Sequence, residues 1–333
     1  MAGHDVRAAW GRFRGVADLD QLGDADWRGR FRHTSRAMST AHFCYPGTWI
    51  WLIPLRGGVS SLGVVSLRER WRPSWSGRAG LEAGLKAHPG LAPLLTDAEA
   101  LDFGACGQVS HSARRFFDPA ARWALTGEAA GFTDPLYSPG CDFIAYSNDM
   151  TCELIRRDVA GLPSAELAEQ LDAYLRHRLR ISMAVYRGQY PGLGSYDLFR
   201  LRYFYDLYNY FNQISAYALD AHLEPSYLRE ALRRGPAAMA ALEGIGRDFA
   251  AMATTLTERG RYYAGNLGGA DGYFDRSFQA SLTRDRTVSD VFKLQRRLHH
   301  AASRRLRAWS AAPDEAPPTT GWMQALWGEV GGY

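Results

Sequence analysis

The chain has 333 residues, of which 46% are hydrophobic and 22% charged, which is ordinary for a globular protein with one large or two modest domains. Its formal net charge of +4 is small for this length and gives no argument for nucleic-acid binding. No stretch approaches the roughly 20 apolar residues that span a bilayer. Residues 1–10 also lack the apolar core of a signal peptide.

The four cysteines show no pattern of a disulfide framework or a metal site. Cys44, Cys106, Cys141 and Cys152 form no C-x-x-C pair, and no Cys/His cluster has zinc spacing. The nine histidines likewise have no spaced partners of a catalytic or metal-binding kind. Free thiols in a reducing compartment are the natural interpretation, so we expect a cytoplasmic protein without a metal site.

The first predicted elements are three strands that form an antiparallel meander. They cover Ser39–Tyr45, Trp49–Leu55 and Val59–Leu67. The dipeptide Gly57-Gly58 between the last two strands is a hairpin signal. In the middle strand Trp49 and Trp51 are two residues apart, so both point to one face of the sheet, and Ile50 points to the other.

After the meander, hydrophobic spacing predicts a short helix, two strands and then a series of helices. The helix is Gly77–Leu95, and the strands are Val109–Phe116 and a short buried one at Trp123–Thr126. The later helices include Asp142–Asp158, one that Ser164 caps and that runs to about Arg187, Leu198–Leu223, and a last one at Val288–Trp309. A Pro-rich tether then leads to a short tail.

Residues 123–140 read W-A-L-T-G-E-A-A-G-F-T-D-P-L-Y-S-P-G, which predicts a strand, a glycine turn and a helix start. Ser138 suits the N-cap, and Pro139 suits the first helical position. The amides of Gly140 and Cys141 would then point out of the helix together with the positive end of its dipole. Such a helix start can hold an anion or the electron-rich edge of a ring.

Two motifs give the chain a family resemblance. Residues 123–140 resemble the second flavin-contacting motif of the flavin-dependent halogenases, which is roughly G-D-A-A-x-F-x-D-P-x-x-S-x-G. Residues 49–54, W-I-W-L-I-P, match the W-x-W-x-I-P signature of the same family. The two motifs lie in the family's order, and the resemblance continues between them and fades after about Pro191.

The resemblance implies that FAD is the cofactor and that one segment contacts it. The implied cofactor-binding residues are Gly127, Glu128, Asp134, Pro135, Ser138, Gly140 and Cys141. Glu128 stands where the family usually has Asp and would accept hydrogen bonds from the ribityl or phosphate part of the flavin. Asp134-Pro135 would place a rigid turn beside the isoalloxazine ring, although simple turn chemistry also explains these residues.

The resemblance also implies a wall between the flavin and the substrate. Its residues are Trp49, Trp51, Pro54 and Tyr137, for which core packing is the simpler alternative. Tyr137 and Pro139 depart from the tryptophan-halogenating branch, which reads D-P-x-E-S-T-G. The missing glutamate removes a candidate proton acceptor, and the missing threonine removes a donor near the halide. These departures argue against free tryptophan as the substrate and leave hydroxylation or reduction open.

Two features of the family are absent from the sequence. There is no G-x-G-x-x-G turn, and the two lysines, Lys86 and Lys293, lie downstream of residues 49–54, whereas the family's catalytic lysine lies upstream. The chain therefore resembles the C-terminal two-thirds of such an enzyme, and no catalytic residue is assigned. Residues 123–126 would complete a parallel cofactor sheet that needs further strands. We expect a truncated product, a wrongly assigned start or one half of a two-chain protein.

The predicted fold class is α+β. An antiparallel substrate-side sheet precedes a flavin-contacting strand-turn-helix and a mainly helical C-terminal region, and the FAD-binding fold is incomplete. The predicted segments are residues 1–121 for the sheet region, 122–160 for the flavin-contacting segment, 161–311 for the helical region and 312–333 for the tether and tail.

The leading hypothesis is an FAD-dependent, halogenase-like monooxygenase or oxidoreductase of secondary metabolism that acts on an aromatic or carrier-bound small molecule. Its expected partners are an N-terminal flavoprotein half and a flavin reductase that supplies reduced FAD. One alternative is a flavin-dependent hydroxylase or reductase. Another is a non-catalytic interaction or substrate-docking module that uses the aromatic helix at residues 199–217 and the basic helix at residues 295–307. Core packing and a solvated face explain those helices more simply.

Overall fold

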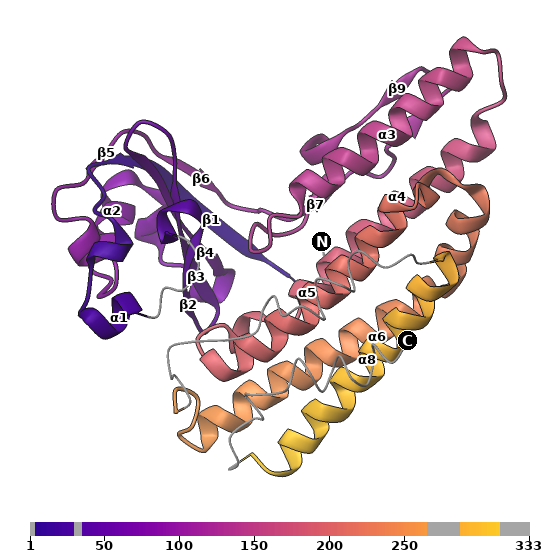
Figure 1. Cartoon of the computed structure of the whole chain (residues 1–333). Helices are drawn as coiled ribbons and strands as arrows, with labels where there is room; N and C mark the ends of the chain where they lie inside the picture. The colour runs from indigo at the N-terminus through magenta and orange to yellow at the C-terminus, as the bar shows by residue number, and fades with distance from the viewer. Residues whose placement is uncertain (1–3, 30–34, 265–286, 314–333) are drawn as a thin grey trace.

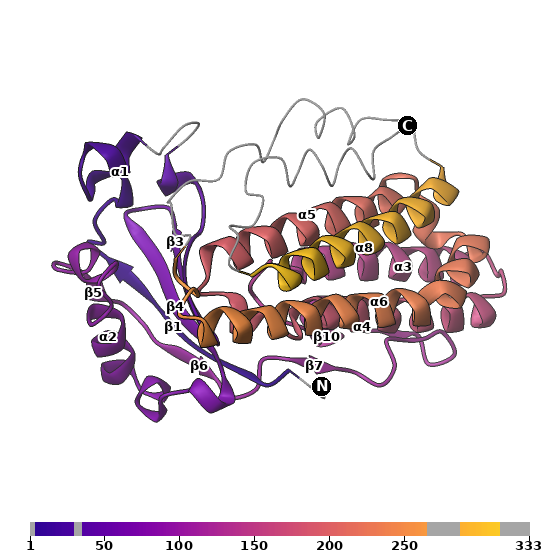
Figure 2. The same ribbon diagram turned by 90° about the horizontal axis from the view of Figure 1, so that it is seen from below.

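The computed structural model describes residues 4–29, 35–264 and 287–313. An antiparallel sheet lies beside a group of long helices (Figure 1). Seen from below, the sheet covers one end of the helices, which run side by side (Figure 2). The predicted mixture of helices and antiparallel strands is therefore confirmed.

The large sheet has six strands in the spatial order β2-β3-β4-β1-β5, and β6 also pairs with β1. The strands are β1 Val6–Arg14, β2 Ala41–Tyr45, β3 Thr48–Pro54, β4 Val59–Leu67, β5 Glu99–Ala100 and β6 Gly104–Cys106. The predicted meander corresponds to β2, β3 and β4, and Gly57 and Gly58 both have the positive φ that the hairpin needs.

The sequence analysis missed β1, which is the central partner of β4, β5 and β6. Consecutive alanines at Ala8 and Ala9 blur its alternation, and Trp10 is 37% exposed. Its partners come from much later in the chain, so no turn signal announces it. The sheet is therefore larger than residues 39–67 alone predict.

The two faces of the sheet pack against different parts of the chain. One face carries Ile50, Leu52 and Leu62 and is covered by the helix α2, Arg78–Lys86. The opposite face carries Trp49 and packs against the C-terminal end of α4, Ala165–Tyr186, and the segment after it. The predicted division of β3, with the tryptophans on one side and the aliphatic residues on the other, is confirmed.

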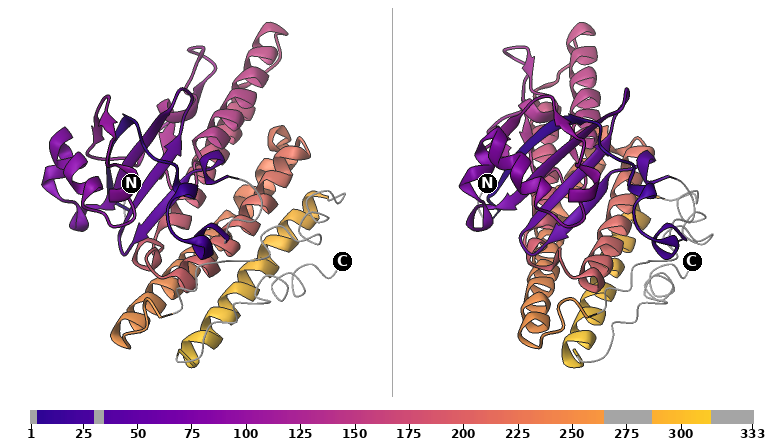
Figure 3. Two further views of the ribbon diagram at one scale, coloured as in Figure 1. Left: turned by 60° about the vertical axis from the view of Figure 1, so that its left-hand side comes forward. Right: turned by 90° about the vertical axis from the view of Figure 1, so that its left-hand side faces the viewer.

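The long helices form one bundle. They are α3 Gly140–Val159, α4 Ala165–Tyr186, α5 Tyr196–Ala218, α6 Pro225–Glu258 and α8 Val288–Ala311, and the short α1 is Ala25–Gly29. The helix α4 packs on α6, and α8 packs on both α5 and α6. Their shared core includes Phe204 and Tyr205, so much of the aromatic helix serves packing. Figure 3 shows the sheet in front of these helices.

The region between the sheet and α3 differs most from the prediction. Val109–Phe116 is reduced to β7, His111–Ser112, and Trp123–Thr126 is reduced to β9, Trp123–Ala124. The strand β9 pairs antiparallel with β8, Phe117–Asp118, and Trp123 is 41% exposed. Within the described residues it is therefore neither buried nor part of a parallel sheet, because the tight loop before it folds the chain back on its own neighbour.

Two further expectations concern membrane-spanning helices and the C-terminal tail. Among the described helices, none is both long and apolar enough to cross a bilayer. The predicted tether and tail at residues 312–333 lie almost entirely outside the described residues, which end at position 313.

Candidate functional site

The two sequence motifs meet where the sheet joins the bundle. Trp49 is 1% exposed and belongs to the same apolar cluster as Leu136 and Tyr190, with Tyr137 packed against it. Trp51 lies beside Trp49, with 5.7 Å between the ring centroids. Residues that are far apart in the sequence therefore share one buried cluster on the tryptophan face of the sheet.

The Asp134 turn follows β10, Gly131–Phe132, and is held by its own carboxylate. Asp134 Oδ1 accepts a hydrogen bond from the amide of Leu136 at 2.9 Å. Its Oδ2 accepts one from the hydroxyl of Tyr190 and lies 2.7 Å from Nε2 of His4. The side chain is fully buried, so the carboxylate faces protein groups and would influence a cofactor through the turn.

The helix start differs from the prediction by one position. Ser138 has a φ of +52°, because its amide closes the turn by donating to the carbonyl of Pro135. Pro139 therefore occupies the N-cap position, and α3 begins at Gly140 without a side-chain cap. The predicted assignment of Ser138 as N-cap and Pro139 as first helical residue was wrong, since a left-handed residue there shifts the helix start.

The start of α3 retains groups that can receive an electron-rich ligand. The first amide hydrogen bond of α3 runs from Phe143 to the carbonyl of Pro139. The amides of Gly140 and Cys141 therefore have no acceptor within the helix. Cys141 is exposed. Asp142 lies in this first turn, where burial raises the pKa of its carboxyl and the hydroxyl of Tyr210 donates to it at 3.2 Å.

The glycine turn packs against the same helix. Gly127 has a φ of +54°, and a Cβ there would come within 2.7 Å of the side chain of Ile144 in α3. Its amide donates to the Ser147 hydroxyl at 3.1 Å. The side chain of Glu128 is exposed, while its carbonyl accepts from His111 Nε2 at 2.8 Å. Glycine is therefore required at position 127, and the carboxylate of Glu128 is accessible to a ligand hydroxyl.

The hydroxyl of Tyr137 points into a buried polar network. It donates to Asp206 Oδ2 at 3.2 Å and accepts from the side-chain amide of Gln189. The carboxyl of Asp206 is also paired with the guanidinium of Arg202 at 2.9 Å. Burial raises the pKa of Asp206 to about 6, although Arg202 opposes this change. Burial and the charge of Asp206 raise the pKa of Tyr137 well above its ordinary value.

The structure thus divides the predicted site residues into groups. The first lies at the sheet and the turn that follows β10, and comprises Trp49, Trp51, Asp134, Pro135 and Tyr137. The second borders the start of α3, and comprises Gly127, Glu128, Ser138, Gly140 and Cys141. Pro54 ends β3 opposite Ser60 and is not a member of the apolar cluster around Trp49.

Several polar residues at this junction were missed by the sequence analysis. They are His4, Gln189, Tyr190, Arg202 and Asp206. Gln189 and Tyr190 lie in the last stretch that still resembles the halogenases, which is a usable signal. His4 comes from a remote segment, while Arg202 and Asp206 are paired four residues apart on the same helix, α5, and only the tertiary structure reveals their neighbours at the junction.

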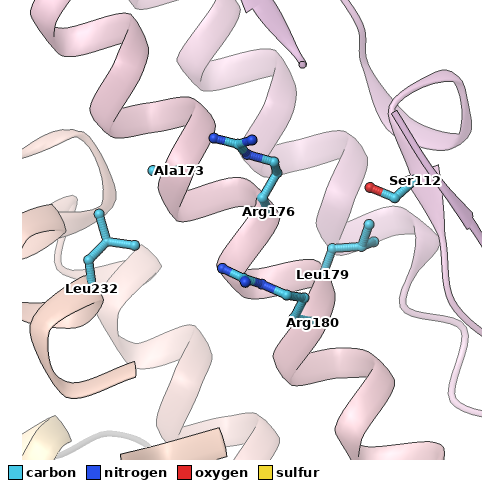
Figure 4. A pocket seen from close by; sticks show the side chains of 6 residues that line it. All are labelled: Ser112, Ala173, Arg176, Leu179, Arg180 and Leu232. Atoms are coloured by element: carbon cyan, nitrogen blue, oxygen red, sulfur yellow. The ribbon is translucent and has the colours of Figure 1, made fainter. Parts of the chain in front are cut away.

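A separate pocket is lined by residues of β7, α4 and α6. Its volume is about 500 Å³, and Figure 4 shows the six side chains around it. The lining residues are Ser112, Ala173, Arg176, Leu179, Arg180 and Leu232. Arg176 is already paired with Asp172 at 2.8 Å. None of the predicted site residues lines this pocket.

Comparison with known proteins connects this arrangement to one family. The flavin-dependent halogenase chlA of Dictyostelium discoideum is 28% identical over 198 residues, which cover 56% of this chain and 32% of chlA. The flavin-dependent halogenase ptaM of Pestalotiopsis fici is 34% identical over 120 residues, which cover 33% of this chain and 22% of ptaM. The chain resembles part of a flavin-dependent halogenase.

The fold comparison agrees with the sequence comparison. A crystal structure of the halogenase PltM in complex with phloroglucinol and FAD superimposes with a TM-score of 0.60 at 14% identity. The match covers 99% of this halogenase-like chain and 58% of PltM. The likeness extends through the helical bundle, beyond the segment in which sequence identity is detectable. No model of a known protein family matches the chain.

The matched curated relatives are longer than the region they share with this chain. The shared region spans about a third of chlA and less than a quarter of ptaM. The two motif groups described above are therefore compared with a part of these enzymes only.

The hydrogen-bond donors and acceptors around the start of α3 are of the chemical types that can bind a flavin. Gly127 leaves the turn without a side chain, the amides of Gly140 and Cys141 are donors, and the carboxylate of Glu128 is an exposed acceptor. Donors at a helix start suit phosphate or the electron-rich edge of a ring, and a carboxylate suits sugar hydroxyls. This donor and acceptor set suits the phosphate or ring edge and the sugar hydroxyls of a flavin.

Proposed function

We propose that this chain forms the substrate side and part of the flavin-binding side of an FAD-dependent, halogenase-like monooxygenase or oxidoreductase. The substrate would be an aromatic or carrier-bound small molecule of secondary metabolism. The relatives support this class, since chlA and ptaM are flavin-dependent halogenases and PltM is a halogenase. The FAD-binding fold would be completed by residues that carry a G-x-G-x-x-G turn, which this sequence lacks.

One observation carries the proposal. The W-x-W-x-I-P strand and the D-P turn are distant in sequence, yet both contact the same tyrosine. The indole N–H of Trp49 donates to the Tyr190 hydroxyl at 3.0 Å, and that hydroxyl donates to Asp134 at 2.7 Å. If each motif served only its own local packing, there would be no reason for the two motifs to share a hydrogen-bonded tyrosine.

The residues of the chain would bind and orient rather than perform the central bond-making step. FAD, in its reduced form, supplies the oxygen-activating redox chemistry when it is bound. The amides of Gly140 and Cys141 would hold its polar edge, Gly127 would keep the turn packed against α3, and Glu128 would accept its hydroxyl hydrogens. Trp49 and Trp51 would exclude water from one side of the reaction space.

Tyr137 sets the polarity beside this space. Its hydroxyl is directed to Gln189 and Asp206, so the ring rather than the hydroxyl would face a ligand on the other side. An aromatic wall suits a flat substrate better than a charged one. A flavin-dependent hydroxylase or reductase remains an alternative activity for the same wall, since no carboxylate stands at position 137 to accept a substrate proton.

The proposed partners are those that the resemblance to the halogenases implies. A flavin reductase would supply reduced FAD, and an N-terminal flavoprotein half would supply the glycine-rich turn and the catalytic lysine. We assign this activity to the cytoplasm, because all four cysteines are free thiols, as a reducing compartment favours. We retain four proposed segments, which are the sheet region at 1–121, the flavin-contacting segment at 122–160, the helical region at 161–311 and the tether and tail at 312–333.

The test is a titration of the purified full chain with FAD, followed by flavin fluorescence. We expect saturable quenching that the variant Glu128→Gln weakens by about tenfold, since it loses a charged acceptor. Glu99→Gln, which alters another exposed glutamate, is the matched control and should bind as the unmodified chain does. No quenching at millimolar FAD, or equal weakening by both variants, would contradict flavin binding at this segment.

A second candidate function is a non-catalytic docking module. It is favoured by a set of apolar side chains on and beside the outer face of α3, of which Ile155 is 57% and Val159 82% exposed. Exposed apolar stripes of this kind are typical of interaction surfaces. A chain that binds no FAD but retains a stable fold would favour this candidate.

A further inference from the structure

The Asp134 carboxylate is fully enclosed by donors from three separate segments. Oδ1 accepts the amide of Leu136, and Oδ2 lies 2.7 Å from both the Tyr190 hydroxyl and His4 Nε2. The exposed fraction of Asp134 is 0%. A buried carboxylate with three partners is held in one orientation, because moving it would leave charge without hydrogen bonds.

Tyr190 connects this carboxylate to the tryptophan strand. Its hydroxyl donates to Asp134 and accepts the indole N–H of Trp49, so one oxygen joins both motifs. Its backbone is also anchored on the sheet, since the Tyr190 carbonyl accepts the amide of Gly47 at 2.8 Å. The short helix η7, Tyr190–Gly192, therefore links the two elements through side chain and backbone.

His4 holds the turn from the opposite direction. It is 5% exposed and lies two residues before β1, the central strand of the sheet. Its ring meets the ring of Tyr190 edge-on at 5.0 Å and also faces Tyr186 at 6.1 Å. The turn is thus attached to β1 through His4 and to β3 through Tyr190 and Trp49.

We propose that Tyr190 and His4 are positioning residues that hold the Asp134 turn, and with it the start of α3, at a fixed distance from the tryptophan strand. In the function proposed above, the turn and the helix start would contact the flavin, and the tryptophans would form the wall toward substrate. The contacts of Tyr190 and His4 with Asp134, called the lock below, would keep the flavin and the substrate wall in one geometry. The functional meaning rests on the proposed function, but the lock itself does not.

The first test is amide hydrogen exchange on the full chain. Tyr190→Phe keeps the ring but removes the shared hydroxyl, so exchange in residues 136–143 and 48–54 should accelerate by about tenfold. Tyr205→Phe is the matched control, because Tyr205 is equally buried and its hydroxyl bonds to His299 Nδ1 within the bundle. That variant should change exchange near His299 and leave residues 136–143 as they are.

His4 provides a second pair of variants in case Tyr190→Phe does not fold. His4→Ala should accelerate exchange in residues 136–143, whereas His4→Gln should restore protection, since its side-chain amide can still donate to Asp134. Unchanged exchange in Tyr190→Phe and His4→Ala would overturn the proposal. So would acceleration spread equally over the bundle, because that indicates general destabilisation instead of a local lock.

The functional arm uses the FAD titration at a temperature where all variants are folded. Tyr190→Phe should weaken FAD binding at least fivefold, and Tyr205→Phe should not. If the unmodified chain binds no FAD, the proposed function fails while the exchange result still decides the lock. If FAD binds equally to both variants despite faster exchange in Tyr190→Phe, the positioning role is wrong and the lock is purely structural.

Discussion

The tryptophan strand and the β9–α3 region expose their large apolar side chains to very different degrees. In β3, Trp49 and Leu52 are 1% and 4% exposed, and both neighbouring strands are paired along its length. In the β9–α3 region, Trp123, Ile144, Ile155 and Val159 are between 41% and 82% exposed. The tryptophan strand therefore has its packing partners within the described residues, whereas the β9–α3 region leaves apolar surface uncovered by them.

This contrast shows that a segment can match a family motif in sequence while its neighbouring apolar side chains lack packing partners in the described structure. The W-x-W-x-I-P motif lies in β3, which is paired with a neighbouring strand on each side. The proposed flavin-side motif is buried at Asp134 and Leu136, which are 0% and 2% exposed, but it exposes Trp123 and continues into a helix with an exposed apolar face. Substitutions in the two regions should therefore have very different consequences for stability.

The largest expected effect is at Trp49. Trp49→Ala removes a fully buried ring and its hydrogen bond to Tyr190, so the free energy of unfolding should fall by about 3–5 kcal/mol. Trp123→Ala, in the exposed region, should change it by less than about 1 kcal/mol. Chemical denaturation of both variants measures the difference. A comparable loss in the two variants would break the comparison.

The next effect tests the close packing under Trp51. A Cβ on Gly63 in β4 would fall 2.1 Å from the Trp51 ring, which cannot be accommodated without movement. Gly63→Ala should lower the free energy of unfolding by about 2 kcal/mol. Gly107→Ala is the control, since nothing lies within 4 Å of a Cβ there. A neutral Gly63→Ala would mean that the tryptophan wall is loosely packed.

A smaller effect concerns pH and the network below Tyr137. Burial raises the folded-state pKa of Asp206 to about 6, above the value of 3.8 for the unfolded chain. The folded state then binds more protons between these values, so this group's contribution to the free energy of unfolding decreases as the pH rises from about 4 to 6. The expected decrease is on the order of 2 kcal/mol.

Asp206→Asn isolates this contribution from those of other carboxyls. Urea unfolding of both proteins across this pH range should give curves that differ in slope, with the unmodified chain losing stability more steeply as the pH rises. Parallel curves would show that Asp206 does not titrate in this range.

The smallest effect is expected on the outer face of α3. Ile155→Ser and Val159→Ser should change the free energy of unfolding by no more than about 0.5 kcal/mol each, because both side chains are mostly exposed. Leu154→Ser, one residue away but 8% exposed, should be clearly destabilising. If the exposed positions proved as costly as Leu154, the stripe would be covered in solution.

The elements that the sequence predicted well carry strong local signals. The hairpin at Gly57-Gly58 and the long helices follow from turn residues and periodicity that act over a few positions. The two halogenase motifs were also readable, because their residue types are specific. The helix start was misplaced, since the positive φ of Ser138 comes from a turn that the sequence does not announce.

The sequence by itself determined the element types, the division of β3 into a tryptophan face and an aliphatic face, and the likeness to halogenases. Only the tertiary structure decided that β1 is the centre of the sheet, that His4 and Tyr190 bond to Asp134, and that Trp49 bonds to Tyr190. Local patterns arise from backbone preferences and side-chain alternation over neighbouring residues. A buried polar network joins residues from distant segments, and no periodicity in the chain encodes which of them will meet.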